Sequence, residues 1–236
     1  MKSTWLFALV AMTSIAATAQ DSTTTGFILY NQIVDISDNP WTRNRPDMPT
    51  EIETKWQTYF TPEGSFCVYK PEPQDDGFNS GGVQFRMMRW EPKDVYYMDF
   101  QAREYRHYNE FMGREFNISD TLSMEGWRMT GKQGIVLGYP CMEAKKVQDD
   151  TVTVLAWFTP RIPVSTGPMG YTGFPGAVLY VNIDDGQTTI SATNIVMGRT
   201  SEEELEFPDD GDEMTREEYE TLVEEKTAEM RRRWRR

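Results

Sequence analysis

The sequence is poor in the side chains that most catalytic and metal sites use. It contains one histidine, His107, and two cysteines, Cys67 and Cys141, in 236 residues. A zinc site of the HExxH type needs two histidines, and an α/β-hydrolase serine nucleophile needs a G-x-S-x-G turn, which is absent. No P-loop, G-x-G-x-x-G or C-x-x-C motif is present either. We therefore expect no catalytic residues, no metal and no cofactor, and we expect His107 to be an exposed residue of a strand or helix.

Positive charge is also scarce. The chain has 24 Lys and Arg against 37 Asp and Glu, a net charge of −13, which disfavours nucleic acid and anionic lipid as partners. The exception is the last six residues, RRRWRR. Cations at a helix C-terminus complement the helix dipole, and with Trp234 they also suit a membrane surface or a partner contact.

Long apolar runs are missing after the first residues, so we do not expect an integral membrane protein. Residues 1–19, MKSTWLFALVAMTSIAATA, combine Lys2, an apolar run and a small-residue cleavage site, the pattern of a signal peptide. A membrane anchor is the alternative, but the run is short. We expect a mature chain from Gln20 in the periplasm or outside the cell. In such an oxidising compartment a structural disulfide between Cys67 and Cys141 is expected, with two free, buried thiols as the alternative.

Most of the mature chain has the pattern of antiparallel β-hairpins. The predicted strands are rich in β-branched and aromatic residues and bounded by Gly, Pro, Asn or Asp; they cover 26–34, 52–59, 65–70, 83–90, 94–108, 127–130, 135–147, 151–158, 176–183 and 188–195. Residues 103–111 are equally compatible with a helix. Thr215 and Glu218 form a capping box that begins a C-terminal amphipathic helix. We expect a mainly β fold, with antiparallel hairpins forming a curved sheet or open barrel and a C-terminal α-helix.

The predicted organisation has four parts: a signal peptide (1–19), a β-rich domain (20–200), an acidic linker (201–214) and the helix (215–236). The acidic run 209–213 offers oxygen ligands for Ca²⁺, but it lacks the spacing of an EF-hand. We interpret it as a solvated linker.

A loop rich in proline and glycine connects two predicted strands between Trp157 and Val181. Proline fixes φ and glycine opens the left-handed region, so this loop has a specified path. It either closes the hydrophobic core or forms the lip of a groove. For the second case, the candidate residues for ligand or partner binding are Trp157, Phe158, Tyr171, Phe174 and Pro175.

The segment TPRIPVSTGPMGYTGFPGAVLYV resembles the signature of the GLPGLI family of Gram-negative envelope proteins. In that family a W-[YF]-T-P-x-I-P segment leads through a Gly-Pro turn into the hexamer that names the family. Here the hexamer is GFPGAV, residues 173–178; its first, third and fourth positions match, and the others stay apolar. The resemblance extends upstream to Gly138, Tyr139, Cys141 and Ala144, and downstream to the acidic loop and the Glu-rich helix. The resemblance implies a location in the cell envelope, but it does not imply a particular activity.

These observations lead to a functional hypothesis. The chain is a non-enzymatic, secreted cell-envelope protein that binds a protein partner, such as an outer-membrane or other envelope protein, or an apolar or peptide-like ligand. The aromatic Gly/Pro-rich loop is the binding element. Two alternatives remain: an envelope hydrolase that uses a pair of carboxylates, and a structural accessory of an outer-membrane complex that docks by its terminal helix.

Overall fold

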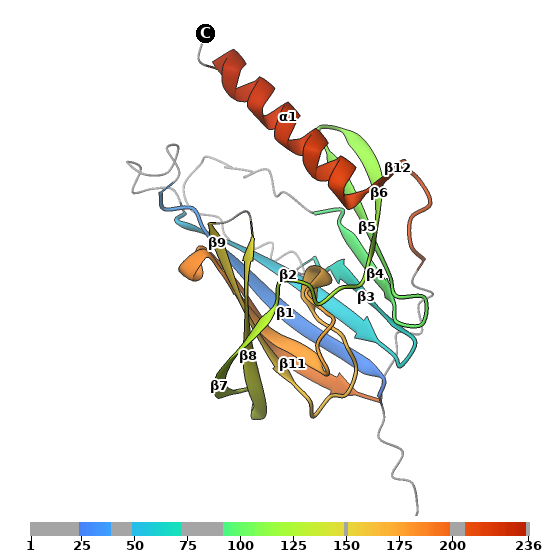
Figure 1. Cartoon of the computed structure of the whole chain (residues 1–236), viewed down its shortest axis with the longest axis vertical. Coiled ribbons are helices and arrows are strands. Elements are labelled where there is room, and N and C mark those ends of the chain that lie inside the picture. Colours follow the sequence, from blue (N-terminus) through green and yellow to red (C-terminus); the bar gives the residue numbers. More distant parts are fainter. Residues whose placement is uncertain (1–23, 39–48, 72–91, 149–150, 199–205, 235–236) are drawn as a thin grey trace, which may run out of the picture.

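Twelve strands form one open sheet in the computed structural model, which describes residues 24–38, 49–71, 92–148, 151–198 and 206–234. The strand order is β12–β6–β5–β4–β3–β2–β1–β11–β10–β9–β8–β7 (Figure 1). The elements are β1 (Gly26–Asp35), β2 (Glu51–Phe60), β3 (Gly64–Tyr69), β4 (Val95–Asp99), β5 (Glu104–Phe111), β6 (Arg114–Thr121), β7 (Arg128–Val136), β8 (Tyr139–Gln148), β9 (Val152–Thr159), η1 (Pro168–Gly170), β10 (Ala177–Ile183), η2 (Asp184–Gly186), β11 (Thr188–Met197), β12 (Asp212–Thr215) and α1 (Arg216–Trp234). The predicted fold class, a mainly β protein with an open sheet and a C-terminal helix, is confirmed.

Neighbouring strands are antiparallel, except that β12 runs parallel to β6. Because side chains alternate between the two faces of a strand, the register places whole rows of residues on the inner face. One such row crosses six strands through Ile28, Thr58, Cys67, Tyr96, His107 and Ile118. Five members of this row are buried, and His107 is half-buried.

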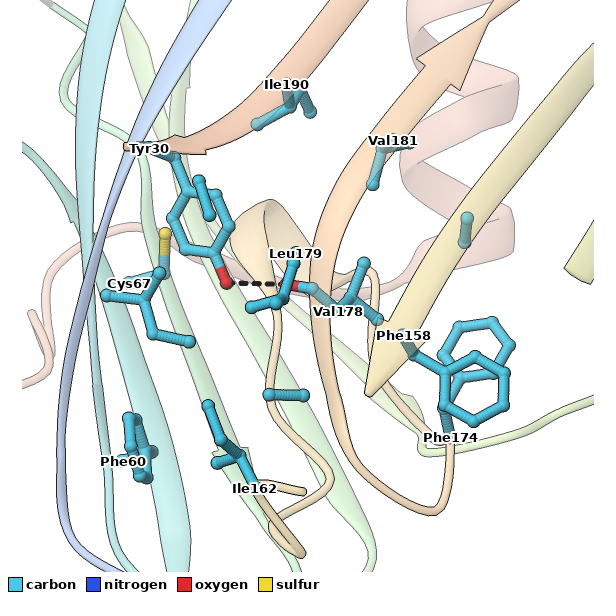
Figure 2. Packing of buried hydrophobic residues seen from close by; sticks show 14 of the residues in the cluster. Tyr30, Phe60, Cys67, Phe158, Ile162, Phe174, Val178, Leu179, Val181 and Ile190 are labelled. Carbon is cyan, nitrogen blue, oxygen red and sulfur yellow. Dashed lines mark hydrogen bonds between the residues drawn. The ribbon is translucent and has the colours of Figure 1, made fainter. Parts of the chain in front are cut away.

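The loop after β9 covers this inner face. Figure 1 shows the ends of the sheet, β7–β8 and β5–β6, on opposite sides of the loop. Its side chains Ile162, Val164 and Phe174 are at most 4% exposed and belong to the same core cluster as the sheet residues. Figure 2 shows the Tyr30 hydroxyl donating a hydrogen bond to the Val178 carbonyl at 2.7 Å. The loop is therefore the second layer of the core, as the core-closing interpretation predicts.

Glycines fix the path of this loop. A Cβ at Gly167 would lie 1.9 Å from the Tyr171 carbonyl oxygen, and one at Gly176 would lie 2.1 Å from the Thr159 carbonyl oxygen. Gly176 also has a φ of +153°, which other residues adopt with strain. The loop backbone passes too close to itself and to β9 for any side chain at these two points.

Helix α1 begins at the predicted capping box. The Glu218 carboxylate accepts hydrogen bonds from the Thr215 amide at 2.8 Å and the Thr215 hydroxyl at 2.9 Å. The first turns dock on the sheet: the Tyr219 hydroxyl donates to Asn109 Oδ1 at 2.5 Å, and Arg216 pairs with Asp120 at 2.6 Å. Beyond these contacts the helix projects away from the sheet (Figure 1). Among the described residues, no helix is long and apolar enough to cross a membrane.

The structure corrects several element boundaries. Residues Glu104–Phe111 form strand β5, so the helical alternative for 103–111 is wrong. The predicted strand 135–147 is interrupted by a turn at Leu137 and Gly138, which have positive φ values of 49° and 81°. Part of the predicted acidic linker forms β12. Strand β6 had no predicted counterpart. The signal peptide and the predicted strand 83–90 lie outside the described residues.

The expected disulfide is absent from this structure. Cys67 lies on β3 and Cys141 on β8, and five strands separate the two in the sheet. Adjacent strands are ~4.8 Å apart, whereas a disulfide needs Cα atoms within ~7 Å. Both thiols are free and buried. Burial raises the pKa of Cys67 to about 11, although hydrogen bonds from Thr58 and Met169 oppose the shift. The structure therefore agrees with the alternative prediction of two free, buried thiols.

Candidate functional site

Within the part of the chain that the structure describes, strand β7 forms one edge of the sheet and pairs only with β8. Its first half is irregular, because the register shifts between Met129 and Gln133, and it carries Arg128 and Lys132. Bulges and charges are the usual protection of an edge strand, whose outer N–H and C=O groups are unpaired. The second half, residues 133–136, is regular and has no charged side chain. This half is an unprotected edge.

Large apolar side chains are exposed along the same edge. Ile135 is 78% exposed, Met129 54% and Leu137 48%. Scattered apolar residues on a surface are ordinary, but a contiguous group marks an interaction site. We call residues 133–137 the β7 edge.

An open hollow of about 860 Å³ lies beside the β7 edge. It is lined by residues of β7, of β8 and of the start of the loop, namely Gln133, Gly134, Ile135, Pro140, Cys141, Met142, Pro160 and Arg161. Sites for small ligands have volumes in this range and a mostly apolar lining with a few polar groups.

Trp157 on β9 supports the wall of the hollow. A Cβ at Gly134 would lie 2.5 Å from Trp157 Cζ3, so the indole can approach β7 only because residue 134 lacks a side chain. The Thr159 hydroxyl donates to the Pro140 carbonyl at 2.8 Å and ties the end of β9 to β8. Two strands and an aromatic ring thus hold the hollow in shape.

Cys141 contributes a neutral thiol to the lining. Its side chain is buried, and its Sγ donates to the Tyr139 carbonyl oxygen at 3.4 Å. Burial raises its pKa despite an opposing hydrogen bond from the Val136 amide, so the thiol stays protonated at neutral pH. Because the thiolate is the nucleophile, Cys141 acts as an apolar surface.

The surroundings of the hollow are basic although the chain carries a net charge of −13. Lys132 pairs with the buried carboxylate of Glu143 at 3.3 Å. Arg128, Lys145 and Arg161 are exposed, and no carboxylate of the described residues forms an ion pair with them. Arg161 thus places one cation without an ion-pair partner among the described residues in a mostly apolar lining, whereas Arg128 and Lys145 lie further along the β7–β8 hairpin.

The structure separates the five residues predicted to bind a ligand or partner. Phe158 and Phe174 are each 1% exposed and stack on one another at 4.8 Å in the core (Figure 2). Tyr171 is half-buried in the loop, where burial raises its pKa to about 12. Pro175 is exposed. Trp157 points to the opposite face of β9 from Phe158 and lies against Gly134, a residue that lines the hollow, without lining the hollow itself.

A second group of polar residues lies on the inner face near α1. Asp94 Oδ1 contacts His107 Nε2 at 2.7 Å and accepts from Asn109 Nδ2 at 2.9 Å. Burial raises the pKa of Asp94, but these hydrogen bonds outweigh burial and lower it overall. The His107 side chain is 16% exposed, so the expectation that it is exposed is wrong, although it does lie on a strand.

This Asp94–His107 pair has a structural role. Tyr96 stacks on His107 at 4.2 Å, and Tyr219 of α1 donates to Asn109. In the described part of the chain no serine, threonine or cysteine is hydrogen-bonded to His107, and no three metal-ligating side chains gather in one place. The pair joins β4, β5 and α1.

Sequence reasoning missed the residues of the hollow. Ile135, Pro140 and Met142 were assigned to one continuous strand, so their position at an edge was hidden. Gly138 was the available signal, because a glycine inside a strand pattern often marks a turn or bulge. Arg161 lies two residues after the end of β9, and nothing in its sequence context marks it.

Comparison with known proteins gives a family match over part of the chain. Residues 96–180 match the model of the Porph_ging family, described as a protein of unknown function. The matched region runs from β4 into β10 and includes the hollow and the loop. No curated protein matches the chain.

Two solved structures share the fold. The chain is similar to the structure of PNGF-II in the P21 space group, with 16% identity and a TM-score of 0.55, over 84% of this chain and 33% of that one. It is equally similar to PNGF-II in the C2 space group, with 14% identity and a TM-score of 0.57, over 84% of this chain and 32% of that one. The chain thus spans about a third of the length of these structures. At this level of identity the likeness concerns the fold alone. Residues 96–180 therefore resemble an uncharacterised family, on a fold that also occurs in PNGF-II.

Proposed function

We propose that this chain is a binding module that takes up an extended segment of a partner protein as an additional strand on the β7 edge. The observation that carries the proposal is the unprotected half of an edge strand beside an apolar hollow of about 860 Å³. In strand addition, main-chain hydrogen bonds supply affinity, and pockets for alternate side chains supply specificity. The β7 edge offers main-chain groups for hydrogen bonds, and the hollow offers a pocket for side chains.

The lining defines the chemistry of the partner segment. Side chains of the added strand that face the hollow would contact Ile135, Pro140 and Met142, so these side chains are apolar. Acidic side chains elsewhere in the segment would pair with cations of the same strand such as Arg128, which has no carboxylate partner among the described residues. We infer an extended segment in which apolar and acidic residues alternate.

The proposed setting is the cell envelope. The signal-like residues 1–19 and the GFPGAV hexamer at 173–178 support a secreted protein of the GLPGLI type. The partner would then be an outer-membrane or other envelope protein, and the module would act by binding and without catalysis. N-terminal sequencing of the protein from its own cells tests the setting: a chain that begins at Gln20 supports secretion, and one that retains residues 1–19 contradicts it.

The binding proposal is tested with a defined peptide and one substitution at the edge. The probe is a labelled peptide that alternates valine and glutamate, compared with a peptide in which lysine replaces glutamate. We expect the acidic peptide to bind and to slow hydrogen exchange of the amides of residues 133–136. Ile135→Lys should weaken binding about tenfold or more, the equivalent of ~1.4 kcal/mol, because a charge at the centre of the edge opposes strand addition.

A matched control uses the other strongly exposed isoleucine. Ile52 on β2 is 46% exposed and lies away from the β7 edge, so Ile52→Lys should bind the peptide like the unaltered protein. Equal binding of both peptides, or equal loss in both variants, would contradict the proposal. Retained thermal unfolding temperatures would show that neither variant has lost its fold.

A further inference from the structure

The far end of α1 concentrates positive charge. Arg231, Arg232 and Arg233 are exposed on the last described turn, and the sequence continues with Trp234, Arg235 and Arg236. The last twelve residues hold six cations and two carboxylates, a net charge of +4. Since the whole chain carries −13, the other 224 residues carry −17. The basic end is the exception on a strongly acidic protein.

The helix separates this basic end from the acidic body. Tyr219 and Arg216 hold the helix on the sheet, and Figure 1 shows the C-terminal end beyond the strands. At 1.5 Å per residue, Arg231 lies ~18 Å further along the axis than Tyr219. The Debye length at physiological salt is ~8 Å. Repulsion between the acidic body and an anionic surface at the helix end is therefore largely screened.

Neighbouring carboxylates neutralise part of this charge and leave the rest. Glu229 pairs with Arg233 at 3.0 Å and with Lys226 at 3.3 Å. Among the described residues no carboxylate pairs with Arg231 or Arg232. Stabilisation of the helix dipole accounts for cations in the last turn, but it gives no reason for three consecutive exposed arginines, two of which have no ion pair among the described residues.

We propose that the C-terminal end of α1 binds the surface of an anionic lipid bilayer. Arginines near such a surface are attracted by the lipid headgroups. Charge complementarity favours this occupant, because exposed arginines at the end of a helix that projects from the sheet can meet a flat anionic surface. The helix lies on the surface or points into it without spanning it. The site does not use the β7 edge, so this proposal is independent of the proposed function and is tested separately.

The test measures sedimentation of the full chain with vesicles of phosphatidylglycerol and phosphatidylcholine, against vesicles of phosphatidylcholine alone. We expect binding to the anionic vesicles only, and weaker binding as salt rises. The variant R231Q/R232Q removes the two unpaired arginines. At about fivefold per arginine, the equivalent of ~1 kcal/mol, the variant should bind ~25-fold more weakly.

The control variant K70Q/R103Q removes the same charge from exposed positions on the sheet and should bind vesicles like the unaltered chain. Equal binding to both kinds of vesicle, equal loss in the two variants, or no binding would overturn the proposal. Two further outcomes would also overturn it. One is tighter binding to heparin or DNA than to the vesicles, which would make the end a general polyanion site. The other is self-association that R231Q/R232Q abolishes while vesicle binding persists.

Discussion

The two edges of the sheet differ in length, charge and cover. The β12 edge has four residues, includes Asp212 and Glu213, and continues directly into α1. The β7 edge includes the second half of a nine-residue strand. This half is regular and carries no charged side chain, and Arg128 and Lys132 lie in the half before it. Short length, charge and a following helix are the usual ways to prevent pairing with another chain. The protein uses all three at the β12 edge, whereas β7 has a register shift and cations only in its first half, so residues 133–136 lack these devices.

The two ends of the sheet are also stabilised by different interactions. We call them the β7 side, which comprises β7–β9 and the loop, and the β12 side, which comprises β4–β6, β12 and α1. On the β7 side, Trp127, Phe158 and Phe174 pack as rings, with Trp127 meeting Phe174 edge-on at 5.0 Å. On the β12 side, α1 is attached through hydrogen bonds and ion pairs centred on Asn109 and Asp120, in addition to contacts of the Tyr219 ring. Apolar packing is insensitive to pH, and polar attachment is not. The two sides should therefore respond differently to substitution and to acid.

The largest expected effect is on the β7 side. Phe174→Ala should lower the free energy of unfolding by about 3–5 kcal/mol, because the ring is fully buried between Phe158 and Trp127. Urea unfolding measures the loss, and hydrogen exchange should show β7–β9 losing protection before β4–β6. Its neighbour Pro175 is exposed, so Pro175→Ala should change the stability little. Equal effects at 174 and 175 would mean that the loop is a surface feature and not part of the core.

A smaller effect is expected on the β12 side. Tyr219→Ala should cost about 2 kcal/mol, since it removes ring contacts with Phe111 and Phe116 and the hydrogen bond to Asn109. Hydrogen exchange should quicken in β12 and α1 and stay unchanged in β7. Tyr219→Phe keeps the ring and removes the hydroxyl, and should cost ~1 kcal/mol. If Tyr219→Ala left β12 protected, the helix would not be what covers that edge.

Local patterns in the sequence predicted much of the fold. Alternating apolar residues and Asp-Gly at 185–186 indicated the β10–β11 hairpin, and the capping box at Thr215 and Glu218 indicated the start of α1. These features depend on neighbouring residues alone. The Asp94–His107 pair and the separation of Cys67 from Cys141 depend on strand order, which no local pattern contains.

The candidate site was harder to predict for the same reason. Aromatic residues in a Gly/Pro-rich loop pointed to a binding surface, but Phe158 and Phe174 have equal reason to be buried, and the curvature of the sheet decides between the two. The hollow depends on Trp157 lying against Gly134, a contact across two strands. Only the register between β7, β8 and β9 brings these residues together.

The smallest expected effect is a dependence on pH that belongs to the β12 side. Asp94 accepts hydrogen bonds from His107, Asn109 and, at 3.4 Å, Tyr96, and its pKa in the folded chain is lowered. A lowered pKa means that the folded state favours the carboxylate. Its contribution is present above the unfolded-state pKa of about 4 and is lost as pH falls through the folded-state value.

Acid unfolding of Asp94→Asn tests this difference between the two sides. The unaltered protein should lose stability through this carboxylate as pH falls below about 4, and the asparagine variant should lack that loss. Asp185→Asn, at the exposed β10–β11 turn, is the matched control and should keep the acid response. Hydrogen exchange in acid should open β4, β5 and α1 first. An acid response that began at β7–β9, or one that Asp94→Asn left intact, would show that polar contacts do not hold the β12 side as inferred, and that the two sides differ only in the chemistry of their edges.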